Sequence, residues 1–248
     1  MPKNSCIMQI WAESGKSALP VCNYSQILYQ FLTFTQNLKW SLFELIGTVA
    51  FASSGAMVGI RKNMDVFGVN ILGITTAVGG GCIRDIILGI TPPQMFQNFS
   101  YVGVSIFISC ILFSVFYLNQ GLLASRFLER YERIMISLDA IGLGVFTVMG
   151  IRTAIELSYE NNIFLLIFVG MVTGIGGGML RDIMADMTPF VFVKHVYAVA
   201  SILGAICYII LRNYIRDTIA VFIGAAVVII IRLLAAHYHW NLPRIHVD

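Results

Sequence analysis

The chain has 248 residues, of which 58% are hydrophobic and only 12% are charged, and its mean hydropathy is +0.81. About a quarter of the residues of a soluble domain are charged, so this composition excludes a soluble globular protein and indicates a membrane protein with several spans. The net charge of +3 is small and the basic residues are dispersed, so nucleic acid is excluded as a partner.

Residues 1–38 are of mixed polarity and lack the basic start and apolar core of a cleaved signal peptide. They are predicted to form a poorly ordered or interfacial extension. Beyond them follow apolar stretches, each near the ~20 residues that a transmembrane helix needs. These stretches cover residues 40–60, 66–90, 98–118, 135–156, 163–186, 191–211 and 218–236. The sequence therefore predicts an all-α integral membrane protein with seven transmembrane helices.

A short motif occurs twice, once in the second and once in the fifth predicted helix. Residues 79–86 read GGGCIRDI and residues 176–183 read GGGMLRDI. Each glycine inside a helix costs about 1 kcal/mol relative to alanine, and charged side chains in hydrocarbon cost several kcal/mol more. A motif with this cost, present twice, points to a functional site in both helices.

The two motifs belong to a longer internal repeat. Arg84 and Arg181 are 97 residues apart, and so are the Thr-Pro pairs that follow the motifs, whereas Glu44 and Asp139 are 95 residues apart. A two-residue insertion between the first and second helices accounts for the difference. Helices one to three and four to six thus form two copies of one unit, and the seventh stands alone. Because each copy holds an odd number of spans, the copies enter the membrane in opposite directions, as an inverted repeat.

The repeat divides the chain into five parts. After the extension come a first repeat over 39–119, a cytoplasmic linker over 120–134, a second repeat over 135–212, and the seventh helix with a tail over 213–248. Short loops on one side of the membrane hold three basic residues and those on the other side hold seven. By the positive-inside rule, the C-terminus is predicted to be cytoplasmic and the N-terminus outside, in the cell (inner) membrane.

The glycine motifs are the predicted solute-binding site. A break in each helix would expose unpaired N–H and C=O groups near the membrane midplane, where they can replace part of a solute's hydration shell. The arginines would face a water-filled interior or pair with nearby aspartates. The predicted pore and solute-binding residues are Gly79, Gly80, Gly81, Arg84, Asp85, Gly176, Gly177, Gly178, Arg181 and Asp182.

Other interpretations of these residues stay open. Glycines in membrane helices often serve only close packing, and an Arg-Asp pair can simply brace a kink. Glu44 and Asp139 are interpreted as acids that complement helix N-termini, with a proton relay as the less favoured alternative. The spans contain no catalytic triad, HExxH motif or clustered metal ligands in sequence, so we expect neither enzyme activity nor a metal or other cofactor.

Together these motifs resemble a known family. The doubled GGGxxRD pattern, the turn over residues 61–68, the sequence DAIGL at 139–143 and residues 197–205 are similar to the bacterial glycine transporter family. That family is in turn similar to prokaryotic members of the trimeric intracellular cation channel superfamily. The resemblance covers residues 40–236 and implies a homotrimer with a separate pore in each protomer, formed by helices kinked at the glycine motifs. The basic lipid-binding motif of the eukaryotic channels is not recognisable here, so phosphoinositide binding is not implied.

Two functions follow, and the sequence does not decide between them. The first is a channel for monovalent cations such as K⁺, which needs only a wettable path. The second is a carrier for glycine or a similar small zwitterion, which needs gates as well as a binding site. A structural or assembly role is a reserve. The expected partners are further copies of the chain, the lipid bilayer and the small solute.

Overall fold

The computed structural model describes residues 24–118, 125–193, 196–238 and 240. Within these residues every regular element is an α-helix. The chain divides into two compact units, Met1–Ser41 and Leu42–Asp248, and the packing described below is that of the second unit.

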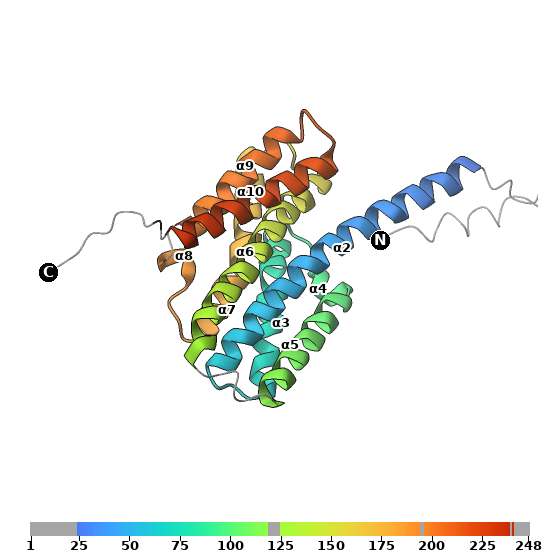
Figure 1. The fold of residues 1–248 in the computed structure, drawn as a ribbon. Coiled ribbons are helices and arrows are strands. Elements are labelled where there is room, and N and C mark those ends of the chain that lie inside the picture. The colour runs from blue at the N-terminus through green and yellow to red at the C-terminus, as the bar shows by residue number, and fades with distance from the viewer. Residues whose placement is uncertain (1–23, 119–124, 194–195, 239, 241–248) are drawn as a thin grey trace, which may run out of the picture. The chain divides into compact units, whose positions relative to one another are not determined.

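Helices follow one another along the chain with short connections (Figure 1). They are α2 (Tyr24–Arg61), α3 (Val66–Ile87), α4 (Gln94–Gln97), α5 (Ser100–Leu118), α6 (Ser125–Glu156), α7 (Ile163–Met184), α8 (Phe190–Val193), α9 (Val196–Leu211) and α10 (Asp217–His237). Six of them contain segments long and apolar enough to cross a membrane, in α2, α3, α5, α6, α7 and α10. The protein is therefore an all-helical, multi-pass membrane protein with six candidate spans.

The sixth predicted span lies on α8 and α9. Helix α9 has 16 residues, fewer than the ~20 that a span normally needs, and is classed as a shorter apolar helix. Of the predicted N-terminal extension, residues 1–23 lie outside the described residues, whereas residues 24–38 are helical and continue into the first span. The predicted linker is also partly helical, because α6 begins at Ser125.

Helices α3 and α7 begin and end in the same way. The Asp65 side chain caps α3 by accepting from the Gly68 N–H over 2.7 Å, and the Asn162 side chain caps α7 by accepting from the Leu165 N–H over 3.1 Å. Beyond the other ends, Gly89 and Asp186 both adopt positive φ, at 73° and 50°. Each of these equivalent positions is 97 residues from its counterpart, so local sequence sets the same boundaries twice.

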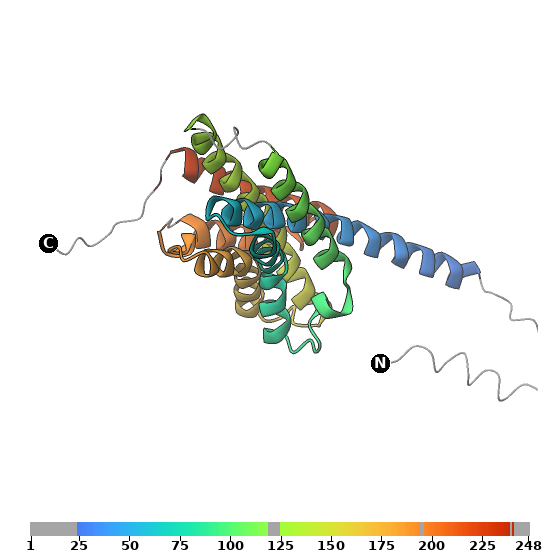
Figure 2. The ribbon, with the colours of Figure 1, turned by 90° about the horizontal axis from the view of Figure 1, so that it is seen from below.

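The centre of the second unit is the contact between α3 and α7. Helix α5 packs on α3, α6 and α9 pack on α7, and α10 packs on α6 and α9. Figure 1 shows α9 and α10 side by side, and Figure 2 shows the same helices from below. The long exposed apolar side chains of α5 and α10 are those expected of surfaces that face lipid.

The glycine motifs do not break their helices. Helix α3 stays α-helical through residues 79–81 and α7 through residues 176–178. A Cβ on Gly80 would overlap the Thr173 carbonyl oxygen, and a Cβ on Gly177 would overlap the Thr76 carbonyl oxygen. Only glycine lets the two backbones come this close, as in other small-residue contacts between membrane helices. The prediction of broken helices with unpaired backbone groups is therefore wrong, and close packing explains the middle glycine of each motif.

Candidate pore and solute-binding site

The first Arg-Asp pair lies at the end of α3, in a polar group of side chains that we call the first cluster. Arg84 Nε donates to Asp85 Oδ1 over 2.8 Å, and Arg84 Nη2 donates to Gln94 Oε1 over 3.0 Å. Asp85 Oδ2 accepts from the Gln94 N–H over 2.7 Å. Glu44 of α2 completes the cluster: its Oε1 lies 3.9 Å from Arg84 Nη1, and its Oε2 accepts from the Tyr101 hydroxyl over 2.6 Å. Three helices and a short turn thus meet at these charges.

The second Arg-Asp pair lies at the end of α7, in the second cluster. Arg181 Nε donates to Asp182 Oδ1 over 2.9 Å, and Arg181 Nη1 donates to Asp139 Oδ1 over 2.7 Å and to Ser54 Oγ over 2.5 Å. Asp182 Oδ2 accepts from the Phe190 N–H over 2.9 Å, and the Phe190 ring lies 5.3 Å from the guanidinium carbon. Arg181, Asp139 and Asp182 are fully buried, so this cluster is closed.

Glu44 and Asp139 are not helix caps. They lie well inside α2 and α6, which begin at Tyr24 and Ser125, and each faces the arginine of its own cluster. The capping interpretation is wrong because both helices extend on the N-terminal side into more polar sequence. The internal repeat could have predicted that each acid faces the arginine of its own half, since an acid and an Arg-Asp pair recur together in both halves.

Sequence reasoning missed Arg232, which lies within the last span. Its side chain is 2% exposed, and its guanidinium carbon stands 4.8 Å from the centre of the Tyr197 ring. Arg232 Nε and Nη2, the Tyr197 hydroxyl and Asp139 Oδ2 are buried and have no hydrogen-bond partner within the described residues. Helix α10 thus adds a cation beside the second cluster, and a lone arginine in an otherwise apolar span was the available signal.

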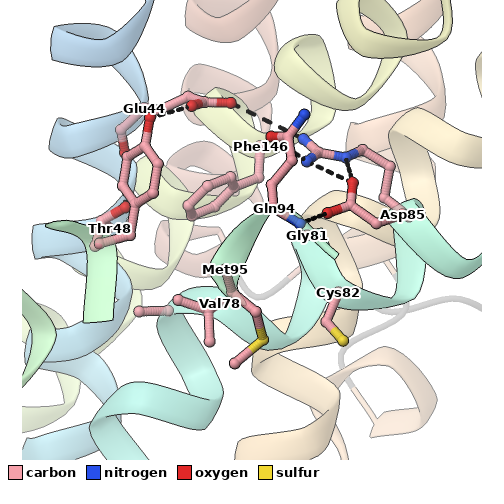
Figure 3. Close-up of a pocket in the computed structure, with 12 residues that line it drawn as sticks. Glu44, Thr48, Val78, Gly81, Cys82, Asp85, Gln94, Met95 and Phe146 are labelled. Carbon is pink, nitrogen blue, oxygen red and sulfur yellow. Dashed lines mark hydrogen bonds and ion pairs between the residues drawn. The ribbon is translucent and has the colours of Figure 1, made fainter. Parts of the chain in front are cut away.

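A pocket opens beside the first cluster (Figure 3). Its cavity volume is about 40 Å³. Its wall is polar at Glu44, Thr48, Cys82, Arg84, Asp85, Gln94 and Tyr101, and otherwise consists of Ala77, Val78, Gly81, Met95 and Phe146. The third glycine of each motif marks the difference between the halves. A Cβ on Gly81 would meet only Arg84 Nη2, at 3.9 Å, whereas one on Gly178 would lie 2.8 Å from the Tyr197 hydroxyl.

Two phenylalanines lie between this pocket and the opposite end of the helices. The Phe51 and Phe146 rings are 5.3 Å apart, Phe146 lines the pocket, and Phe51 is fully buried against Gly142 and Gly177. A second hollow of about 340 Å³ is lined by Val58, Arg61, Lys62, Met135 and Met187. Glu44 and Val58 are about 21 Å apart along α2, from the helical rise per residue. The two hollows therefore lie toward opposite ends of the candidate span of α2, Lys39–Arg61, with the phenylalanines and the glycine contact between them.

The structure divides the ten predicted site residues into two groups. Four of the six glycines lie where α3 and α7 meet, because a Cβ on Gly79, Gly80, Gly176 or Gly177 would lie within 3.1 Å of the facing helix. The third glycine of each motif lies outside this contact: Gly81 borders the pocket, and Gly178 faces Tyr197. The four charged residues form two separate clusters, each with an acid from α2 or α6. The structure thus places both motifs around one helix contact but does not bring the two Arg-Asp pairs together.

Comparison with known proteins identifies the family. The sequence model of the glycine transporter family matches residues 41–117 and again residues 136–213. The chain belongs to the glycine transporter family. It is 38% identical to a UPF0126 membrane protein of Vibrio cholerae, over 82% of this chain and 81% of the relative. It is 32% identical to the UPF0126 inner membrane protein YadS of Escherichia coli, over 83% of this chain and 95% of the relative.

Solved structures extend this likeness of the glycine transporter family to a class of channels. A prokaryotic TRIC channel crystallised in 0.5 M KCl is 30% identical, with a TM-score of 0.74 over 83% of this chain and 100% of that chain. The TRIC trimeric intracellular cation channel orthologue from Rhodobacter sphaeroides is 29% identical, with a TM-score of 0.72 over 81% of this chain and 98% of that chain. The chain therefore has relatives among membrane channels.

Proposed function

We propose that this member of the glycine transporter family is a homotrimeric channel that passes monovalent cations such as K⁺ through a path within each protomer. The observation that carries the proposal is the pair of hollows toward opposite ends of the candidate span of α2, the first lined by Glu44 and Asp85. Similarity to proteins described as trimeric cation channels supports both the conducted ion and the trimer. In cation pathways, carboxylates favour cations over anions.

The proposal includes seven spans in a 3+3 inverted repeat, with α9 as the sixth span. It is supported by the double match of the family model, whose two segments begin 95 residues apart. Equivalent hydroxyls behave alike: Thr76 Oγ1 donates to the Leu72 carbonyl and Thr173 Oγ1 to the Val169 carbonyl, both over 2.6 Å. The parts 39–119 and 135–212 are the two copies, joined by the linker 120–134 and followed by 213–248.

The orientation in the membrane is also part of the proposal. The side with seven basic loop residues, which include Arg61 and Lys62, is cytoplasmic, and the side with three is outside. The C-terminus is then cytoplasmic and the N-terminus outside. The hollow near Arg61 opens toward the cytoplasm, and the pocket near Glu44 opens toward the other side.

Ions move between the hollows past the two central phenylalanines. In the proposed path the Phe51 and Phe146 rings, which pack together beside the glycine contact, form the closed gate. Opening requires these rings to turn aside. The four motif glycines at the helix contact, Gly79, Gly80, Gly176 and Gly177, let α3 and α7 slide against one another. The charged residues Arg84, Asp85, Arg181 and Asp182 set the electrostatic potential at the two ends of the path.

A second candidate is a carrier for glycine or a similar small zwitterion. The observation that favours it is the Glu44 carboxylate 3.9 Å from the Arg84 guanidinium, both on the wall of the pocket. A zwitterion could place its ammonium on the first and its carboxylate on the second. The packed phenylalanines supply the gate that a carrier needs.

The experiment that separates these functions uses purified protein in liposomes loaded with KCl. We expect K⁺ flux that follows the membrane potential and does not saturate, and no uptake of labelled glycine with or without a proton gradient. Protein-free liposomes are the control. Saturable glycine uptake without K⁺ flux would overturn the channel and establish the carrier.

A further inference from the structure

The two clusters differ in the balance of their charges. The second cluster and its neighbour on α10 hold two cations, Arg181 and Arg232, and two anions, Asp139 and Asp182. All four side chains are at most 2% exposed. Tyr197 stands between Arg232 and the rest of the cluster. These four side chains are therefore both closed off and balanced in charge.

The first cluster keeps an excess of negative charge. The charged side chains on the pocket wall are Glu44, Arg84 and Asp85, one cation and two anions. Gln94, an uncharged residue, accepts the remaining hydrogen bond of the guanidinium. The first cluster, which lines a pocket, is thus the one in which a carboxylate is left without a full counter-charge.

Glu44 is that carboxylate. Arg84 Nη2 lies 2.7 Å from Asp85 Oδ1, whereas Arg84 Nη1 lies 3.9 Å from Glu44 Oε1. The guanidinium therefore neutralises mainly the charge of Asp85. Both Asp85 oxygens are bound, one by Arg84 and the other by the Gln94 N–H. Glu44 Oε2 accepts from Tyr101, while among the residues that the structure describes Oε1 has only the Arg84 guanidinium, 3.9 Å away. An ionised carboxylate within a membrane span is costly unless a cation accompanies it.

We propose that Glu44 binds the cationic group of the transported solute in this pocket. The class of ligand is a small monovalent cationic group, either an alkali ion such as K⁺ or the ammonium of a small amino acid. Glu44 Oε1 supplies the charge, and the hydroxyls of Thr48 and Tyr101, on the same wall, supply further oxygen ligands. Figure 3 shows Glu44 and Thr48 on the side of the pocket that faces Phe146. The inference rests on the proposed function and names Glu44 as the residue that binds the transported solute.

Cys82 makes the inference testable without a transport assay. It is half-buried on the wall of the same pocket, and its thiol is free. In the full chain with Cys6, Cys22, Cys110 and Cys207 replaced by serine, the rate at which N-ethylmaleimide modifies Cys82 reports whether the pocket is occupied. The rate is measured in detergent with KCl, and with N-methyl-D-glucamine chloride of the same ionic strength, each with and without glycine.

We expect K⁺ or glycine to slow the modification of Cys82 several-fold, and Glu44→Gln to abolish this protection. Protection by K⁺ alone identifies an alkali-ion site, and protection by glycine alone identifies the ammonium of a zwitterion. Glu156→Gln is the matched control, because Glu156 is an exposed acid that pairs with Arg152 on the same helix. It should keep full protection. Glu44→Asp, whose shorter side chain withdraws from the pocket, should need more solute for the same protection.

Absence of protection by either solute, or protection that Glu44→Gln and Glu44→Asp both leave unchanged, would overturn the inference. Failure of the proposed function looks different. If liposomes with the wild-type protein carry neither K⁺ nor glycine while Glu44-dependent protection persists, the transport function fails and the site stands. If flux is present and no protection is found, the site fails and the function stands.

Discussion

At the scale of single residues, neighbouring glycines of one motif have different tasks. Gly80 is held against the backbone of α7, where no side chain can fit, whereas Gly81 faces the pocket. Glycine is required at position 80 because two main chains approach each other there and neither can move aside. Glycine at position 81 keeps the space beside Arg84 open. The motif thus combines a packing contact and a pocket wall in adjacent residues.

We expect Gly80→Ala to destabilise the protein and Gly81→Ala to leave its stability near that of the wild type. The added methyl of Gly80→Ala overlaps the Thr173 carbonyl oxygen, and overpacking of this kind costs about 1–3 kcal/mol. At Gly81 the added Cβ would lie 3.9 Å from its nearest neighbour, Arg84 Nη2, which is an ordinary van der Waals distance. Thermal unfolding in detergent measures both variants. Equal melting temperatures would contradict the packing role of Gly80.

The two arginines of the motifs also differ. Arg181→Met should cost about 3–5 kcal/mol, because it leaves Asp139 and Asp182 buried without their cation. Arg84→Met should cost less, because only one of its two acids, Asp85, is fully buried, whereas Glu44 is 16% exposed and borders the pocket. It should also change ion flux. The yield of folded protein and the flux of each variant are compared. Similar losses of folded protein in both would show that Arg84 has the same structural role as Arg181.

At the scale of helices, hydrophobic length predicted where the helical segments lie, because the cost of burying a polar residue in lipid limits each span. It did not predict how the glycine motifs act. Three glycines permit either a broken helix or a close contact, and the choice depends on Thr76 and Thr173 of the facing helix, which periodicity does not reveal. Helix starts were misjudged as well, since residues before 40 and before 135 are polar enough to suggest loops and yet continue α2 and α6.

The pairing of α2 with α6 at Phe51 and Phe146 leads to an expectation about gating. Phe51→Ala removes a ring that packs against both Phe146 and the glycine contact, so we expect faster K⁺ flux than in the wild type. Phe43→Ala is the matched control, because Phe43 is a buried ring of α2 that packs edge-on to Phe222, away from the gate. It should lower stability without raising flux. Unchanged flux in Phe51→Ala would place the gate elsewhere.

At the scale of the whole molecule, the proposal gives each protomer its own path. The pocket, the phenylalanine pair and the second hollow are all built from residues of one chain. The trimer then serves to assemble three independent channels and not to form one central pore. Its existence is drawn from relatives described as trimeric, and the path is drawn from the residues of this chain.

Mixed trimers test this independence. Gly81→Trp places an indole in the pocket beside Arg84, which should block the path of its own protomer. Wild-type and blocked chains with different affinity tags are co-expressed, and trimers with one or two blocked chains are purified. We expect two thirds and one third of the wild-type K⁺ flux. A complete loss of flux with a single blocked chain would show one shared pore.

The most direct test of the central claim, a cation-selective path, is the reversal potential of the current through the protein in a bilayer with unequal KCl on its two sides. The account predicts a reversal potential close to the equilibrium potential of K⁺, shifted toward zero by Glu44→Gln. A current that reverses near the Cl⁻ potential, or the absence of current while the same protein takes up glycine, would contradict it.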